Sequence, residues 1–138
     1  MPKKIKENNS YDVVIIGGLG HVGLPLGLVL ADKGLKVCLH DKDTKNATLV
    51  QKGGMPFIEY GAEAILKKLI KKKDALTIST DIKEVAKADY IIVAVGTPVD
   101  EYLNPNVRKF LELFIALKKY LNKTQTVIIR STIYPRTC

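Results

Sequence analysis

Short apolar runs alternate along this chain with longer segments in which apolar residues recur every three or four positions. The short runs are rich in Val and Ile, which is typical of buried parallel strands. The longer segments have the spacing of amphipathic helices. The pattern predicts strands at Tyr11–Ile16, Leu35–Asp41, Leu76–Ser79, Tyr90–Val95 and Thr126–Arg130.

Helices are expected between these strands. We predict an apolar helix up to Gly34, a short helix within 42–54 before a turn at Gly53 and Gly54, an amphipathic helix over 62–73, a short helix capped by Thr80 with Lys83 at its third position and ending near Ala88, and a last helix over 107–120. Strands that alternate with helices favour an α/β fold. We expect a doubly wound parallel sheet of about five strands in the order 3-2-1-4-5, with helices on both faces.

The turn after the first strand carries the motif Gly-x-Gly-x-x-Gly at Gly18, Gly20 and Gly23. In a phosphate-binding turn, Gly18 permits the tight turn, Gly20 lets a pyrophosphate approach the backbone, and Gly23 allows the helix to pack closely. The N–H groups at the start of the helix would then face the phosphates. The order of strand, glycine turn and helix predicts a Rossmann-type dinucleotide-binding unit, and the alternative is a glycine-rich turn with a structural role alone.

The second predicted strand ends on an acidic residue, Asp41. It follows Gly18 at close to the usual spacing of about 20 residues. A carboxylate in this position accepts hydrogen bonds from the diol of a ribose and repels a 2′-phosphate. NAD is therefore favoured over NADP, although Lys42 directly after the acid weakens this discrimination.

The composition is that of one ordinary globular domain. The 138 residues are 46% hydrophobic and 26% charged, and no apolar run approaches the length of about 18 that a membrane span needs. The polar stretch 1–10 has no secretory character, so we expect a flexible tail followed by one domain over 11–138. Two cysteines make no disulfide framework, and Cys38, in mid-strand, is expected to be buried and inert. A cytoplasmic location is expected.

The net charge of +8 is compatible with anionic partners. However, many of the lysines gather near the end of a predicted helix, where they complement the helix dipole and solvate one face: Lys67, Lys68, Lys71, Lys72 and Lys73. No aromatic stacking platform accompanies them, so we expect no nucleic-acid partner. Neither a membrane partner nor a metal site is predicted.

Four motifs in order, at 18–26, 56–59, 95–100 and 131–135, resemble the N-terminal NAD-binding domain of the UDP-glucose/GDP-mannose dehydrogenase family. They read Gly-Leu-Gly-His-Val-Gly-Leu-Pro-Leu, Pro-Phe-Ile-Glu, Val-Gly-Thr-Pro-Val-Asp and Ser-Thr-Ile-Tyr-Pro. The Gly-Thr-Pro-Val-Asp form, with Met-Pro-Phe before the glutamate, looks most similar to the UDP-N-acetylmannosamine and UDP-N-acetylglucosamine 6-dehydrogenases. A UDP-glucose 6-dehydrogenase domain is the alternative.

The resemblance implies a reaction. Members of the family oxidise the C6 alcohol of a nucleotide sugar to a carboxylate with two NAD, through a thiohemiacetal and a thioester on a cysteine. That cysteine, the dimer-forming central helix and the sugar-binding domain lie further along the family's chains, and Cys138 does not match the cysteine by position. We therefore expect this chain to be inactive alone and the full-length protein to be a homodimer. The alternatives are a stand-alone NAD-binding regulatory module, or a truncated and partly unfolded product with an exposed sheet edge.

Carried over by position, the glycine turn would hold the pyrophosphate, with His21 and Val22 offering backbone N–H groups. Asp41 would hold the adenosine ribose. The imidazole of His21 is not expected to act as an acid or a base. The family has a basic residue five positions after the ribose acid, where this chain has Asn46, so the adenosine contacts in that loop are open.

The resemblance also implies roles for later loops. Gly96 and Thr97 would lie near the nicotinamide ribose. Thr132 would lie near the reacting centre and position a water, and it is the one catalytic candidate. Thr97 could instead only end a strand before proline, and Thr132 could be a capping hydroxyl. Glu59 matches a loop glutamate of the family and is given no chemical role, because a loop or capping carboxylate is the simpler interpretation.

Overall fold

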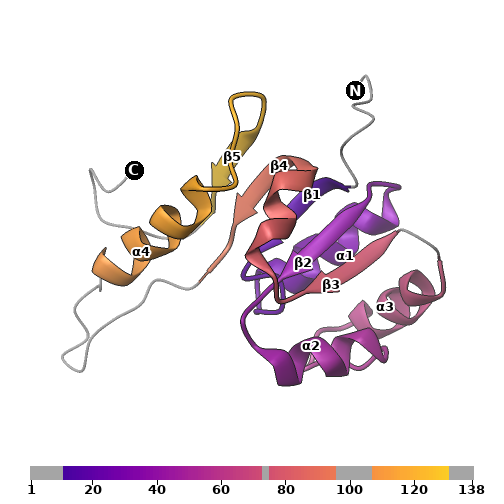
Figure 1. Cartoon of the computed structure of the whole chain (residues 1–138). Helices are drawn as coiled ribbons and strands as arrows, with labels where there is room; N and C mark the ends of the chain where they lie inside the picture. Colours follow the sequence, from indigo (N-terminus) through magenta and orange to yellow (C-terminus); the bar gives the residue numbers. More distant parts are fainter. Residues whose placement is uncertain (1–10, 73–74, 96–106, 131–138) are drawn as a thin grey trace.

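The computed structural model describes residues 11–72, 75–95 and 107–130, and these form one parallel sheet with helices on both faces (Figure 1). The sheet has the strand order β3-β2-β1-β4-β5, and every pairing is parallel. This confirms the predicted order. The strands are β1 Tyr11–Ile16, β2 Val37–His40, β3 Leu76–Ser79, β4 Ala88–Val93 and β5 Thr126–Ile129.

One face of the sheet is covered by α1 Gly23–Asp32, α2 Thr44–Gln51 and α3 Ala62–Lys71. Strand residues that alternate along β1 and β2, such as Val13, Ile15 and Leu39, point into this layer, where they meet Leu28 of α1 and Leu66 of α3. All of these side chains are buried. The three helices follow the predicted segments, because their apolar stripes match the apolar face of the sheet.

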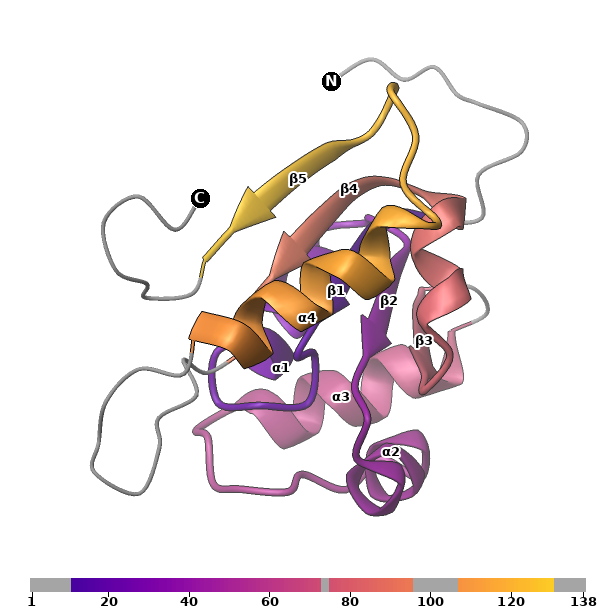
Figure 2. The ribbon, with the colours of Figure 1, turned by 60° about the vertical axis from the view of Figure 1, so that its left-hand side comes forward.

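The opposite face is covered by the 3₁₀ helix η1 Ile82–Lys87 and by α4 Val107–Lys118 (Figure 2). The predicted Thr80 cap was wrong. The carboxylate of Asp81 accepts the backbone N–H of Lys83 at 3.0 Å, so the helix begins one residue later than predicted and is a 3₁₀ helix. β4 follows at Ala88, before the predicted start of that strand, because Ala88 pairs in register with Tyr11.

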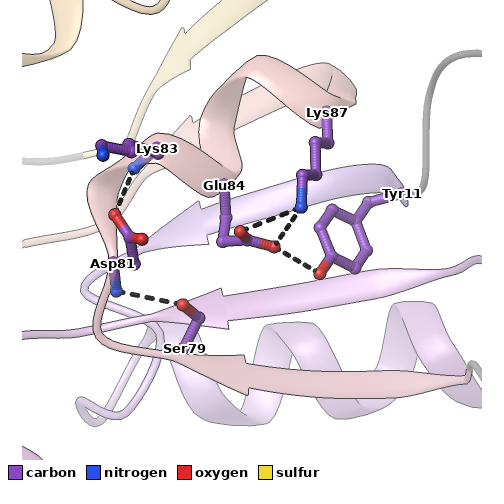
Figure 3. A network of polar contacts seen from close by, with 6 residues as sticks. All are labelled: Tyr11, Ser79, Asp81, Lys83, Glu84 and Lys87. Carbon is purple, nitrogen blue, oxygen red and sulfur yellow. Dashed lines mark hydrogen bonds and ion pairs between the residues drawn. The ribbon is translucent and has the colours of Figure 1, made fainter.

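A small polar network joins η1 to the sheet (Figure 3). The hydroxyl of Tyr11 donates to Oε1 of Glu84 at 2.6 Å, and Lys87 Nζ lies 3.2 Å from Oε2 of the same carboxylate. Partial burial and this hydrogen bond raise the pKa of Tyr11. At the other end of η1 the backbone N–H of Asp81 donates to Ser79 Oγ at 3.0 Å. These contacts attach both ends of η1, which has only Val85 as a buried residue.

The charged surface includes the lysine-rich end of α3. Lys68 and Lys71 lie in its last turn, and Lys68 pairs with Asp32 of α1. This confirms the predicted place of Lys68 and Lys71 at a helix end, whereas Lys73 lies outside the described residues. Within the described residues, no helix is long and apolar enough to cross a membrane, and no group of three acidic, His or Cys side chains is arranged to hold a metal ion.

Among the α4 side chains that the structure describes, Leu117 is the one that is fully buried. Leu117 is 0% exposed, whereas Leu111 and Ile115 on the same helix are 46% and 65% exposed. Leu113 and Phe114 add partly buried contacts to the same core layer. Since this helix makes few other buried contacts in the described part of the chain, Leu117 should carry much of its docking energy.

The substitution Leu117→Ala should lower the free energy of unfolding by about 2–5 kcal/mol, because it leaves a cavity under α4. Ile115→Ala, on the exposed face of the same helix, should change it by no more than about 0.5 kcal/mol. Urea denaturation of the two variants and the wild type measures both. Equal losses would show that Leu117 is not the anchor.

Candidate dinucleotide-binding site

The glycine turn leaves β1 through a backbone conformation that only glycine adopts easily. Gly17 has φ +80°, so the left-handed position lies one residue before Gly18, where the motif predicts the tight turn. Gly18 serves another purpose. A Cβ at Gly18 would lie 2.8 Å from the Cβ of Leu39, so its missing side chain lets the turn pack directly on β2.

The other two glycines differ in what a side chain would meet. A Cβ at Gly23 would lie 2.3 Å from the carbonyl oxygen of Gly17, so the start of α1 is pressed against the turn. At Gly20 the nearest atom would be the same oxygen at 3.5 Å, an ordinary contact. Gly23 is therefore required by packing, as predicted. Gly20 leaves an open backbone surface, which suits the predicted approach of a pyrophosphate.

Donors without a partner gather at this open surface. Among the described residues, the backbone N–H groups of His21 and Val22 have no hydrogen-bond partner, whereas that of Leu24 donates to the Gly20 carbonyl at 3.1 Å. In the described part of the chain no side chain caps α1, and the first turn of this helix holds no acidic residue. The positive end of the helix dipole and these two N–H groups together favour an anion at this surface.

Asp41, the first residue after β2, reaches back to the same turn. Its Oδ2 accepts the backbone N–H of Leu19 at 3.2 Å, and its Oδ1 accepts that of Asp43 at 3.2 Å. Each carboxylate oxygen has two lone pairs, so both can accept further hydrogen bonds. The N–H groups of Gly17 and Gly18 also donate to the His40 carbonyl, at 3.0 and 2.9 Å. The ribose-binding candidate and the phosphate-binding turn thus form one hydrogen-bonded unit.

Gly96, Thr97 and Thr132 lie outside the described residues, and their roles stay predictions. The strand ends before them are described. A Cβ at Gly17 would lie 2.9 Å from the backbone nitrogen of Val95, and the N–H of Arg130 donates to the Val93 carbonyl at 2.8 Å. The ends of β4 and β5, which lead to Gly96 and to Thr132, therefore lie at the same edge of the sheet as the glycine turn.

Glu59 and Cys38 have simple environments. The Glu59 side chain is exposed and has no partner among the described residues, while its carbonyl accepts the N–H of Ala62 at 3.1 Å. It is therefore a loop carboxylate here and not a cap. Cys38 is 0% exposed, and burial raises the pKa of its thiol to about 12. The thiol stays protonated at neutral pH, as expected for an inert cysteine.

Sequence reasoning missed His40, the last residue of β2. It is 4% exposed, and its Nδ1 has no hydrogen-bond partner within the described chain. Burial lowers its pKa, and the nearby charge of Asp41 acts in the opposite direction. His40 lines a cleft of about 660 Å³ together with Lys42, Thr80, Asp81, Ile82, Glu112, Leu113 and Ala116. The only sequence signal was a histidine at the end of an otherwise apolar strand.

Sequence reasoning also missed a contact of His21. Its ring stacks on Phe57 from the loop between α2 and α3, with ring centroids 4.2 Å apart and an angle of 20° between the planes. Phe57 in turn packs against the core layer under α1 and α3. No spacing rule connects positions this far apart, so the pairing was not visible in the sequence.

The glycine contacts give a direct test of the turn. Gly23→Ala should lower the free energy of unfolding by about 1–3 kcal/mol, because backbone atoms must move to admit the methyl group. Gly20→Ala, in the same motif but with open space around it, should change it by no more than about 0.5 kcal/mol. Thermal and urea denaturation compare the two variants, and similar losses would contradict this description of the turn.

Comparison with known proteins gives a consistent result. Residues 12–138 match the family described as UDP-glucose/GDP-mannose dehydrogenase family, NAD binding domain. UDP-N-acetyl-D-mannosamine dehydrogenase of Methanococcus aeolicus is 33% identical over 137 residues, which cover 97% of this chain and 30% of that protein. UDP-N-acetyl-D-glucosamine 6-dehydrogenase of Pseudomonas aeruginosa is 30% identical over 122 residues, covering 88% of this chain and 28% of that protein.

A solved structure agrees with these relatives. The crystal structure of GDP-mannose dehydrogenase from Pseudomonas aeruginosa superposes with a TM-score of 0.81 and 27% identity over 91% of this chain and 29% of that one. The chain thus spans less than a third of the length of each of these proteins. Its fold, its glycine turn and these matches establish that the chain belongs to the UDP-glucose/GDP-mannose dehydrogenase family, as an NAD-binding domain.

Proposed function

We propose that this chain supplies the NAD half-site of a nucleotide-sugar 6-dehydrogenase. The observation that carries the proposal is the hydrogen bond between Leu19 N–H and Asp41, beside the N–H groups of His21 and Val22, which have no partner among the described residues. An extended dinucleotide needs these two kinds of group side by side, donors for its pyrophosphate and an acceptor for its ribose.

In this proposal the pyrophosphate lies over Gly20, where a donor surface is open. The backbone N–H groups of His21 and Val22 donate hydrogen bonds to it, and Gly23 allows α1 to begin close to the turn. Asp41 accepts hydrogen bonds from the adenosine ribose. Gly96 and Thr97 would contact the nicotinamide ribose, and Thr132 would position a water near the reacting carbon. When bound, NAD supplies the hydride acceptor.

For the substrate we propose a UDP-N-acetylhexosamine, of the mannosamine or glucosamine type, with UDP-glucose as the alternative. The motif after β4 and the mannosamine and glucosamine relatives at 33% and 30% identity support this choice, and a putative UDP-glucose 6-dehydrogenase of Bacillus subtilis, also 30% identical, supports the alternative. The full reaction oxidises the sugar C6 alcohol to a carboxylate with two NAD. We propose that it needs a further domain that carries the nucleophilic cysteine, that the complete protein is a homodimer, and that it works in the cytoplasm.

The cofactor site is tested by calorimetric titration of the 138-residue chain with NAD and, separately, with NADP. NAD should bind saturably and more tightly than NADP, because Asp41 repels the 2′-phosphate. Asp41→Ala should weaken NAD by roughly 10- to 100-fold, since charge-assisted hydrogen bonds to the ribose are lost, and should reduce the preference for NAD over NADP. If neither NAD nor NADP binds, the proposal is overturned.

Two variants serve as controls. Asp43, two residues away, caps α2 by accepting the N–H of Asn46 at 3.0 Å, so Asp43→Ala should lower stability by about 1 kcal/mol and leave the ratio of the two affinities unchanged. Gly20→Ala should weaken NAD and NADP by the same factor, because its methyl group occupies the pyrophosphate surface. A changed ratio in Gly20→Ala would place the pyrophosphate elsewhere.

The 138-residue chain alone should not oxidise a nucleotide sugar. Its one described cysteine, Cys38, is buried and protonated, and so cannot attack an aldehyde. Absorbance at 340 nm, followed with NAD and each of UDP-N-acetylglucosamine, UDP-N-acetylmannosamine and UDP-glucose, should stay flat. A complete dehydrogenase of the family serves as the positive control. Steady NADH formation by this chain would refute the need for a further domain.

A further inference from the structure

The outer part of the glycine turn is held differently from its inner part. Gly17 and Gly18 are tied to β2 by hydrogen bonds to the His40 carbonyl, and Leu19 is tied to it through Asp41. Beyond Leu19 the described residues of the turn make no further hydrogen bond to β2, and Gly20 is bonded only within the turn and to α1, through the Gly17 carbonyl at 3.2 Å and the Leu24 N–H at 3.1 Å. His21 is exposed, its N–H has no partner among the described residues, and its one specific side-chain contact there is the ring of Phe57.

Phe57 is suited to hold this outer part in place. It belongs to the loop between α2 and α3, but its side chain is partly buried and packs against the core layer that includes α1 and α3. Its ring lies nearly parallel to that of His21, with centroids 4.2 Å apart and 20° between the planes. One side of Phe57 is therefore fixed by the core, and the other supports the turn.

A glycine-rich turn benefits from such support. Glycine has more backbone freedom than other residues, so ordering the turn around a ligand costs conformational entropy. If the turn is already ordered in the free protein, binding does not lose this entropy and the affinity is higher. The N–H groups of His21 and Val22 must point in one direction to reach a pyrophosphate together, and the orientation of the His21 backbone is coupled to the position of its ring.

Given the cofactor role proposed above, on which this inference rests, we propose that Phe57 is a positioning residue for the pyrophosphate of NAD. It acts through His21: the stacked rings hold residues 20–22 in the conformation that presents the two free N–H groups. Phe57 itself contributes no hydrogen bond to the ligand, and His21 acts through its backbone and not as an acid or base.

The neighbours of Phe57 provide a matched control. Ile58 and Tyr60 belong to the same loop and are 89% and 97% exposed, so they neither reach the core nor support the turn. A loss of cofactor affinity caused by general disturbance of this loop would appear in Ile58→Ala as well. A loss caused by the stack would appear only when the ring of Phe57 or that of His21 is removed.

The test compares NAD affinity in Phe57→Leu, His21→Ala, the combination of these two, Phe57→Tyr and Ile58→Ala by calorimetry. Phe57→Leu keeps an apolar side chain in the core but removes the ring, and should weaken NAD by about 2- to 12-fold, the range expected for one aromatic pair. Phe57→Tyr, which retains an aromatic ring, and Ile58→Ala should both bind NAD with wild-type affinity. Combining Phe57→Leu with His21→Ala should weaken binding no further than either change alone, because both remove the same contact.

A second measurement needs no cofactor. In the ligand-free chain, ¹⁵N relaxation should show lower order parameters for the backbone of Gly20, His21 and Val22 in Phe57→Leu, and unchanged values in Ile58→Ala. Two results would overturn the positioning role even if NAD binds as proposed. One is an order parameter in Phe57→Leu that equals the wild-type value. The other is a double variant in which the losses of NAD affinity caused by Phe57→Leu and His21→Ala multiply. If the wild-type chain does not bind NAD, the cofactor role fails, while the relaxation data still decide whether Phe57 orders the turn.

Discussion

The close contact between the start of α1 and the end of β1 is the constraint on which the site depends. It exists because Gly23 has no side chain that would collide with the Gly17 carbonyl, and because Gly17 adopts a left-handed conformation. This contact directs the N-terminus of α1 toward the carboxyl edge of the sheet. The N–H groups of His21 and Val22, which have no partner among the described residues, lie at this point as a consequence, beside the stacked rings of His21 and Phe57.

The second strand completes the arrangement. β2 lies directly beside β1 in register, Val13 opposite Val37, so its end meets the glycine turn. The absence of a side chain at Gly18 lets Leu39 pack against the turn, and Asp41 then accepts the N–H of Leu19. The carboxylate thus has a structural partner before any ligand is considered. Its place beside the phosphate-binding surface follows from strand pairing and not from its own conformation.

The two halves of the sheet are covered unequally in the described part of the chain. The half with β1, β2 and β3 is packed under three helices, and its side chains are almost completely buried. On the same face of β4 and β5, Tyr90 and Ile128 remain 38% and 44% exposed. The candidate site for the adenosine half of the cofactor therefore stands on the better packed half of the domain.

The sequence alone predicted the strand order, the helical segments and a candidate dinucleotide site, because these depend on local patterns: apolar runs, helical spacing, a glycine motif and an acid at a strand end. It misplaced the cap of η1, and it assigned the tight turn to Gly18 whereas the positive φ lies at Gly17, since adjacent residues such as Thr80 and Asp81, or Gly17 and Gly18, are equally suitable by type. Only the tertiary structure brought Phe57 onto His21 and His40 into the wall of a cleft. These contacts join segments far apart in the chain, and the physical reason that they form is the packing of a whole layer, which no local pattern contains.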